Sequence, residues 1–400
     1  MKRLKILMLT RLYPSQAFPG FGTFSMERAK ALAEHADVRV MVPTPYFPSW
    51  LPGREEWKKW ASVEREGKLP AEIRVTYPRY VSIPGSATWF QGVAMAHSVS
   101  RELALNYEGW QPDVIDGHFV FPDGYAAMRL GQAIDAPMVV TCHGSDLRLY
   151  PDIPIAGAMT RKTLRSANRI VSVSSDLMRR SIELGCPSER AVFLTNGVDP
   201  AKFLVRSQAV CRMKLGLPAD RKIGVYVGYF IDRKDQSLIL RALSEIRKQG
   251  EQPPLVVLVG EGPNRQRLQD EVAHLGLAGD VIMAGQRSHD EVALWMGAAD
   301  WLLLSSSSEG WATVYFEAMA CGRPVITSNV SSAKDAINQP SYGIVVEPRT
   351  PEAFATAMMN ASRRQFDPQT IRAYAETHSW RLWADHAMEI FNSVTQKEFQ

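Results

Sequence analysis

Short apolar runs alternate with amphipathic helical patterns along the whole chain of 400 residues. Because these runs are apolar almost without interruption, they are typical of parallel strands buried on both faces. In the first half we predict such strands at residues 6–10, 38–42, 114–115, 138–142, 170–173 and 191–194. Between them, segments such as 24–33 and 124–133 have the spacing of helices. This alternation predicts an α/β fold with doubly wound parallel sheets.

The rhythm restarts after the Asn-Gly-Val-Asp stretch at 196–199, where Asn-Gly and the following Pro200 favour a linker. A chain of this length also exceeds what one hydrophobic core usually serves. We therefore predict a Rossmann-like domain at 1–199, a second at 200–379, and a helix in 380–400 that packs back across the domain boundary. The second set of predicted strands is 223–227, 255–259, 281–284, 301–304, 325–327 and 343–346.

Composition excludes several classes of protein. The net charge is +4, and the basic excess lies in residues 1–199. That excess is too small for a nucleic-acid binder, but it suits contact with an anionic membrane or a phosphorylated lipid. No apolar run approaches the roughly 18–20 residues that span a bilayer. The four cysteines are far apart and the histidines show no metal-binding spacing, so we expect reduced thiols, no metal and a cytoplasmic protein.

One proline-rich segment, 43–60, interrupts the pattern and ends in a short basic and aromatic stretch. Trp50, Trp57 and Trp60 lie there beside Lys58 and Lys59. The segment is either a surface excursion with partly buried indoles or a loop that contacts an acceptor or a membrane, since Trp and Lys favour the headgroup region. In the second case, the basic groups that extend the surface would include Arg161, Lys162 and Arg165. The protein would then be peripheral at the inner face of the cytoplasmic membrane.

The strongest motif is the stretch S-E-G-W-A-T-V-Y-F-E-A-M-A-C-G-R-P at 308–324. Glu309 lies just past the carboxyl end of a predicted strand, where open α/β sheets bind ligands. A helix is expected to begin near Thr313, so that free amides around Thr313 and Val314 can take a diphosphate. Glu317, one turn further, either accepts both ribose hydroxyls or is a solvated helix charge. Glu309 is placed to accept sugar hydroxyls or to stabilise positive charge at an anomeric carbon.

The E-G-x6-E pattern followed by A-M-A-C-G-x-P-V resembles the nucleotide-sugar signature of family 4 retaining glycosyltransferases, which have the GT-B fold of two Rossmann-like domains facing a cleft. Further matches occur in the family's order along nearly the whole chain. Gly228 and Lys234 match its phosphate-binding strand and loop, and Gly260 and Gly262 match its V-G-x-G-P turn. Gly310 belongs to the signature itself. The phrases T-R-x-Y-P, F-x-x-P-D-G-Y-A-A and H-G-S-D-L resemble the branch of teichuronic-acid and exopolysaccharide transferases.

In the first domain, glycines at 20 and 22 open a helix after the first strand, and Gly22 would let backbone approach donor or acceptor phosphates closely. Two later strands end in Asp-Gly-His at 116–118 and His-Gly-Ser-Asp at 143–146. The resemblance implies that His118 faces the transferred sugar, although a histidine satisfied by core packing is the alternative. His143 and Asp146 are candidates for the acceptor side.

The sequence also departs from the family. Most relatives carry an arginine where this chain has Tyr229, and that arginine pairs with the later lysine on the donor phosphates. Lys234 remains, with Arg233 beside it, so either Arg233 replaces the missing cation or Tyr229 is a neutral donor. Moreover, the usual G-G-x-x-E loop is here S-S-A-K-D at 331–335.

Taken with the resemblance, these features predict a retaining, metal-independent transferase that moves a hexose-type sugar from a UDP- or GDP-sugar to a glycan or lipid-linked acceptor in cell-surface or exopolysaccharide synthesis. His118, Lys234 and Glu309 are the expected catalytic residues, and no cofactor is expected. No D-x-D metal motif occurs, so Lys234, the helix N-terminus and Arg233 would neutralise the leaving diphosphate. A nucleotide-sugar 2-epimerase and a non-catalytic sugar-nucleotide-binding protein are the alternatives, whereas the missing G-x-G-x-x-G disfavours a dehydrogenase.

Overall fold

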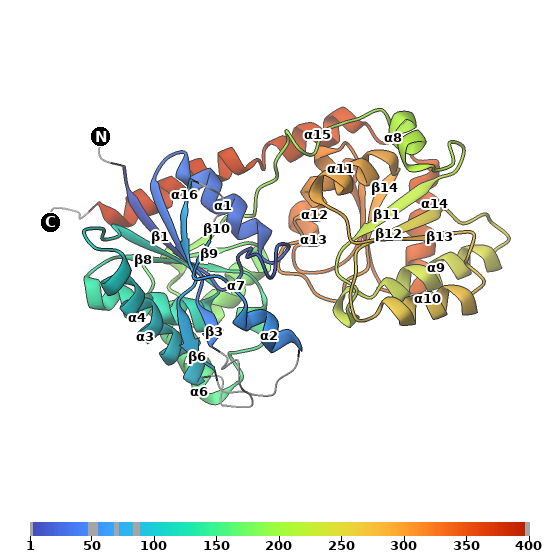
Figure 1. Ribbon diagram of the computed structural model, residues 1–400. Coiled ribbons are helices and arrows are strands. Elements are labelled where there is room, and N and C mark those ends of the chain that lie inside the picture. Colours follow the sequence, from blue (N-terminus) through green and yellow to red (C-terminus); the bar gives the residue numbers. More distant parts are fainter. Residues whose placement is uncertain (1–2, 47–54, 68–71, 83–88, 397–400) are drawn as a thin grey trace. The chain divides into compact units, whose positions relative to one another are not determined.

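The computed structural model describes residues 3–46, 55–67, 72–82 and 89–396 (Figure 1). The chain divides into two compact units: unit 1 comprises Met1–Asn196 and Trp380–Gln400, and unit 2 comprises Gly197–Ser379. The chain thus leaves unit 1 three residues before the expected boundary at Asp199. Just past this crossing, the Val198 amide donates to the carbonyl of His378 (2.8 Å), immediately before the chain returns to unit 1.

Unit 1 is built on an eight-stranded sheet in the order β10-β9-β8-β7-β1-β2-β5-β4, parallel except where β4 meets β5. A separate parallel pair joins β3 to β6. The strands are β1 (Lys5–Leu9), β2 (Asp37–Met41), β3 (Thr44–Tyr46), β4 (Glu66–Gly67), β5 (Arg74–Thr76), β6 (Arg79–Val81), β7 (Val114–His118), β8 (Met138–Cys142), β9 (Arg169–Ser172) and β10 (Ala191–Phe193). The helices are α1 (Thr23–Ala33), α2 (Glu55–Ala61), α3 (Trp89–Asn106), α4 (Tyr125–Ile134), α5 (Ser145–Arg148), α6 (Pro154–Ser166), α7 (Ser175–Glu183) and α16 (Trp380–Thr395), with short turns η1 (Val120–Gly124) and η2 (Ser188–Arg190).

The last helix, α16, belongs to the core of unit 1 although the chain has passed through unit 2 to reach it. It packs against α1, and its apolar face contributes Trp383, Ala387 and Phe391 to the cluster that contains the strand residues Ile6 and Val40. The buried Arg28 of α1 lies over the Trp383 ring and also donates to Asn196, the residue at which the chain leaves the unit. One side chain therefore holds the chain near both crossings.

Unit 2 is built on a six-stranded, fully parallel sheet in the order β13-β12-β11-β14-β15-β16. Numbered within the unit, this is the order 3-2-1-4-5-6 of the Rossmann fold, with its switch point between β11 and β14. The strands are β11 (Ile223–Val227), β12 (Leu255–Val259), β13 (Val281–Gly285), β14 (Trp301–Leu304), β15 (Val325–Ser328) and β16 (Gly343–Val346). The helices are α8 (Gln208–Leu215), α9 (Gln236–Lys248), α10 (Arg265–His274), α11 (His289–Ala298), α12 (Val314–Ala320), α13 (Ala333–Ala336), α14 (Pro351–Arg363) and α15 (Pro368–Glu376), with turns η3 (Asp232–Lys234) and η4 (Pro340–Tyr342). Helices cover both faces of this sheet in Figure 1.

The predicted strands of both units are present, and most are buried as expected. Two edge strands are the exceptions. The run at 191–194 was predicted to be buried, but Phe193 is 43% exposed because β10 ends the sheet and has a neighbour on one side only. The residues of β13 after Val281 are likewise half-buried at the other sheet's edge. The apolar pattern alone does not distinguish an edge strand from a central one.

All four cysteines are buried free thiols. Among the described residues, no helix combines the length and the apolar character needed to cross a membrane. Trp50 lies outside the described residues, whereas Trp60 of α2 packs against the ring of Phe18, with centroids 4.4 Å apart. Lys58 and Lys59 on the same helix are exposed. On α6, Lys162 and Arg165 are also exposed, whereas Arg161 is half-buried and donates to the carbonyl of Pro151.

Candidate functional site

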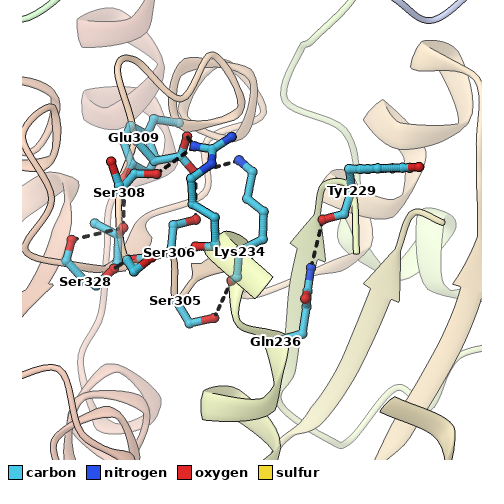
Figure 2. Close-up of polar contacts among 12 residues, drawn as sticks. Tyr229, Lys234, Gln236, Ser305, Ser306, Ser308, Glu309 and Ser328 are labelled. Atoms are coloured by element: carbon cyan, nitrogen blue, oxygen red, sulfur yellow. Dashed lines mark hydrogen bonds and ion pairs between the residues drawn. The ribbon is translucent and has the colours of Figure 1, made fainter. Parts of the chain in front are cut away.

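A buried carboxylate flanked by two cations lies at the carboxyl edge of the unit 2 sheet. Lys234 ends the turn that follows β11, and Glu309 lies in the loop between β14 and α12. The Lys234 ammonium is 2.6 Å from Glu309 Oε1, and the Arg233 guanidinium is 3.3 Å from Oε2. Figure 2 shows Lys234 extended toward Glu309. Because the connections after β11 and β14 diverge at the switch point, this edge is where a Rossmann sheet binds its ligand.

A serine hydroxyl binds this carboxylate, and further hydrogen bonds hold the backbone of its loop. Ser306 Oγ donates to Glu309 Oε1 (2.6 Å), and the Arg233 guanidinium also donates to the carbonyl of Ser308 (2.7 Å). From the next loop, Ser331 Oγ donates to the Glu309 backbone carbonyl (2.5 Å). Ser331 is the first residue of S-S-A-K-D, so this departure from the family motif supports the main chain at Glu309.

The charge state of Glu309 follows from these contacts. Burial alone raises the pKa of the Glu309 carboxyl, but the charge and hydrogen bond of Lys234, the hydrogen bond of Ser306 and the charge of Arg233 outweigh it, so the pKa lies below its ordinary value. A buried carboxylate is stable only with such partners. Glu309 is therefore an anion that is paired with both cations.

The exposed tyrosine that replaces the family arginine takes no part in this cluster. Tyr229 is 59% exposed, and in Figure 2 its ring extends away from Glu309 and Lys234, while Gln236 donates to its backbone carbonyl (3.1 Å). Arg233 instead forms an ion pair with Glu309. Of the two groups that the sequence left open, Arg233 is the one that the structure brings to Lys234.

The predicted glycines of unit 2 shape the loop that carries Tyr229. A Cβ at Gly260 would overlap the carbonyl of Gly228, and one at Gly262 would overlap the backbone of Phe230. The Phe230 amide donates to the carbonyl of Glu261 (2.8 Å), which ties the two loops together. Thus Gly260 and Gly262 are needed for close packing of backbone on backbone. Gly228 itself has an ordinary φ, and a Cβ there would be 3.2 Å from the Tyr226 hydroxyl.

The helix expected after Glu309 is α12, which begins after Gly310 and its cap Thr313. Its first internal hydrogen bonds come from Tyr315, Phe316 and Glu317, so the amides of Thr313 and Val314 precede them. Burial raises the pKa of Glu317 to about 7, against the lowering effects of the Thr313 hydrogen bond and the Lys202 charge. Glu317 is half-buried rather than a freely solvated helix charge.

In unit 1, the glycine predicted near the phosphates has a clear packing requirement. Gly22 caps α1 with φ 70°, and a Cβ there would overlap the carbonyl of Leu12, which follows β1. Only glycine satisfies both conditions without strain. This contact brings the start of α1 against the loop after β1, at the carboxyl edge of the unit 1 sheet.

The histidine expected to face the sugar is buried. His118, the last residue of β7, is 0% exposed and uses both ring nitrogens: Nε2 is 3.1 Å from Asp116 Oδ2, and Nδ1 is 3.0 Å from His143 Nε2. The side chain of His118 thus has no exposed surface in this structure, and the contact with the sugar that the resemblance implies for it stays a prediction. His143 is partly exposed, and the rings of Phe24 and Phe119 lie on it, with centroids 5.1 and 4.6 Å away.

The acceptor-side role of Asp146 stays a prediction, and in this structure its side chain binds the backbone of its own loop. Its carboxylate is fully buried and accepts backbone amides from Gly144 (2.7 Å), Val120 (3.0 Å) and His143 (3.2 Å). Burial raises the pKa of Asp146, and these amides act in the opposite direction. Asp146 thus holds the loop that carries His143.

The sequence did not assign roles to several side chains that complete the two clusters. Asp116 binds His118, and Ser306 binds Glu309, yet each was seen only as part of a strand end. The burial of Arg28 was not predictable from the sequence, because a charged residue in an amphipathic helix is expected on the solvated face. Among the described residues, no group of three or more His, Cys, Asp or Glu side chains is arranged to hold a metal ion.

The two halves of the chain match two family models: residues 20–202 match the one described as "Glycosyltransferase Family 4", and residues 208–378 match "Glycosyl transferases group 1". A similar sequence is the "Putative teichuronic acid biosynthesis glycosyltransferase TuaC" of Bacillus subtilis, 29% identical over 368 residues that cover 90% of each chain. The sucrose-phosphate synthase of Thermosynechococcus elongatus has a similar structure, with a TM-score of 0.78, 18% identity and coverage of 98% of this chain and 99% of that one. Anabaena HepE in complex with UDP and glucose gives a TM-score of 0.72 at 17% identity, with coverage of 98% and 100%.

Proposed function

Because the chain is a glycosyltransferase of the family 4 and group 1 type with the GT-B fold, we propose that it transfers a hexose-type sugar from a UDP- or GDP-sugar to a glycan or lipid-linked acceptor. The transfer retains the anomeric configuration and needs no metal ion. The observation that carries this proposal is the carboxylate of Glu309 between Lys234 and Arg233 at the sheet edge.

Lys234 and Arg233 are proposed to stabilise the leaving diphosphate. A diphosphate gains negative charge as the bond from its oxygen to the anomeric carbon breaks, and preorganised cations stabilise that charge without reorganisation. Lys234 and Arg233 both form ion pairs with Glu309. When the diphosphate binds, it competes with this carboxylate for the same cations, which frees Glu309 to accept sugar hydroxyls or to face the positive anomeric carbon.

Bond making occurs on the face from which the diphosphate departs. The acceptor oxygen forms the new bond to the anomeric carbon, and the released phosphate oxygen takes the acceptor's proton. The stereochemical part of this proposal rests on the family resemblance. Glu317, in the first turn of α12, binds the two ribose hydroxyls of the donor.

The similar Anabaena structure contains UDP and glucose, and the Bacillus relative is named for teichuronic acid biosynthesis. The first supports a nucleotide-sugar donor, and the second supports an acceptor in cell-surface polysaccharide synthesis. An acceptor of this type, when carried on a lipid, requires the protein to approach the membrane surface, which the exposed Lys58 and Lys59 on α2 favour.

The test is a donor screen with the purified chain. UDP-, GDP- and ADP-sugars are incubated with and without EDTA, and release of the nucleoside diphosphate is measured; we expect turnover with one of the first two and no loss in chelator. Glu309→Gln, which keeps the shape but removes the charge, should abolish turnover. Release that stops in EDTA and returns with magnesium or manganese would refute the metal-free mechanism, and conversion of the donor sugar to its 2-epimer would identify an epimerase.

A further inference from the structure

A buried chain of hydrogen bonds in unit 1 runs from a carboxylate through one imidazole to a second. Asp116 and His118 lie at alternate positions of β7 and so project from the same face of the sheet. Asp116 Oδ2 is 3.1 Å from His118 Nε2, and His118 Nδ1 is 3.0 Å from His143 Nε2. The two imidazole planes are inclined by only 15°, which suits a hydrogen bond lying in both rings.

The direction of each hydrogen bond follows from its first member. A carboxylate only accepts, so His118 must donate from Nε2 to Asp116. A neutral imidazole carries one N–H, which leaves His118 Nδ1 as an acceptor. His143 must consequently donate from Nε2, and its remaining nitrogen, Nδ1, keeps a free lone pair.

The surroundings of the two imidazoles favour their neutral forms. Burial, opposed by Asp116, lowers the pKa of His118, and burial together with the charges of Arg28 and His118 lowers the pKa of His143 well below its ordinary range. The Arg28 guanidinium also interacts electrostatically with Asp116. A single proton arrangement therefore satisfies the chain.

The exposed end of this chain lies at the carboxyl edge of the sheet. His143 follows the last residue of β8 and is the member of the three that is partly exposed. Its Nδ1 makes no hydrogen bond within the described part of the chain. Phe119, which packs on it, adopts φ 63°, a conformation that a bulky residue rarely takes. Such local strain is typical of positions that a site must hold in place.

We propose that Asp116 and His118 are positioning residues that fix the tautomer of His143, so that its Nδ1 accepts a hydrogen bond from a hydroxyl of the sugar or acceptor. The inference rests on the proposed function for the identity of the hydroxyl-bearing ligand. It assigns ligand contact to His143 rather than to His118. It also explains why His118 is buried yet bonded at both ring nitrogens.

The first measurement is the tautomer itself, observed by ¹⁵N NMR of histidine-labelled, ligand-free protein. We expect the Nε2–H form for both His118 and His143, with resonances assigned by single substitutions. A His143 ring protonated at Nδ1 would overturn the proposal. This result does not depend on turnover, so it stands even if the donor screen finds no transferase activity.

The second measurement uses a variant in which the direction of both hydrogen bonds is reversed. In Asp116→Asn the new amide can donate to His118 Nε2, which moves the N–H of His118 to Nδ1 and that of His143 to its own Nδ1. We expect this variant to show the switched His143 tautomer and to lose about 10- to 100-fold in kcat/KM for transfer, since an acceptor has become a donor. Affinity for the bare nucleoside diphosphate should not change. If the His143 tautomer switches while kcat/KM for transfer is unchanged, the proposed role of the tautomer is wrong.

A double-mutant cycle separates this role from a structural one. His118→Leu interrupts the chain, so Asp116→Asn should add no further loss in that background. An additional loss there would mean that Asp116 acts by another route. Asp113→Asn is the matched control, because Asp113 precedes the same strand and bonds to the Lys5 amide instead of a histidine, and it should leave transfer unchanged.

Discussion

Replacing Arg233 by alanine tests the central electrostatic claim of the donor site. Arg233 is the cation that joins Lys234 on Glu309, whereas Tyr229, at the position of the family arginine, points away from that group. The diphosphate carries more charge in the transition state than in the ground state. Loss of a cation beside it should therefore lower kcat more than it weakens binding.

The size of the effect follows from distance and exposure. At the 3.3 Å that separates Arg233 from the Glu309 carboxylate, two unit charges interact by about 1 kcal/mol in water and about 5 kcal/mol at an effective dielectric constant of about 20. The Arg233 side chain is 48% exposed, so a phosphate oxygen in the same place lies between these limits. A loss of about 3 kcal/mol corresponds to about 10²-fold in kcat, near the lower end of what one preorganised oxyanion donor contributes.

The assay is steady-state release of the nucleoside diphosphate by Arg233→Ala, with Arg241→Ala as the matched control. Arg241 is also a half-exposed arginine in an ion pair, with Glu271, but it lies on α9, outside the Glu309 cluster. Tyr229→Arg should be neutral or harmful, because a second cation would compete for the same oxygens. A kcat for Arg233→Ala close to that of the parent, together with acceleration by Tyr229→Arg, would show that Arg233 has not replaced the family arginine.

Three further predictions concern single features. Since the pKa of Glu317 is raised to about 7 and only its ionised form accepts both ribose hydroxyls, calorimetric affinity for the nucleoside diphosphate should rise up to about tenfold per pH unit below that pKa; Glu317→Gln should abolish the slope, and a slope that persists would assign it to another group. Gly262→Ala should cost about 1–3 kcal/mol in chemical denaturation because its Cβ meets the Phe230 backbone, whereas Gly279→Ala, with open space around it, should be neutral. The chain should float with anionic but not neutral liposomes, and Lys58→Glu with Lys59→Glu should abolish this; failure to bind either liposome would remove the membrane from the proposal.

The parts of the fold that depend on periodicity were predictable. Six strand predictions in unit 2 correspond to its six strands, because each strand is apolar on both faces and is bounded by turn residues. The position of Glu309 at a sheet edge followed from the same reasoning, since it comes directly after such a strand. The sequence could not supply the partner of Arg233, because a chain position beside Lys234 is compatible with a side chain directed to solvent or to the site.

The burial of single polar residues was not predictable from the sequence. The resemblance assigned His118 to the transferred sugar, and Asp146 was a candidate for the acceptor side because polar side chains at strand ends often bind a ligand. In the structure both are fully buried and their hydrogen bonds hold neighbouring groups. Whether a polar group at such an edge contacts the ligand or supports a residue that does is decided by the loop above it, whose conformation local sequence does not specify.

Part of the hydrogen-bond chain from Asp116 through His118 to His143 could nevertheless have been predicted from the sequence. Residues two apart on a strand share a face, so Asp116 and His118 had to be neighbours once β7 was placed. In the parallel pairing of β7 with β8, His118 lies opposite Thr141, and residues that pair in register also share a face. His143, two residues beyond Thr141, is then the diagonal neighbour of His118 even though it lies just past the strand. The missing steps were therefore the pairing of β7 with β8 and the register of that pair, since the sequence itself supplied the strand positions and the spacing of the polar residues.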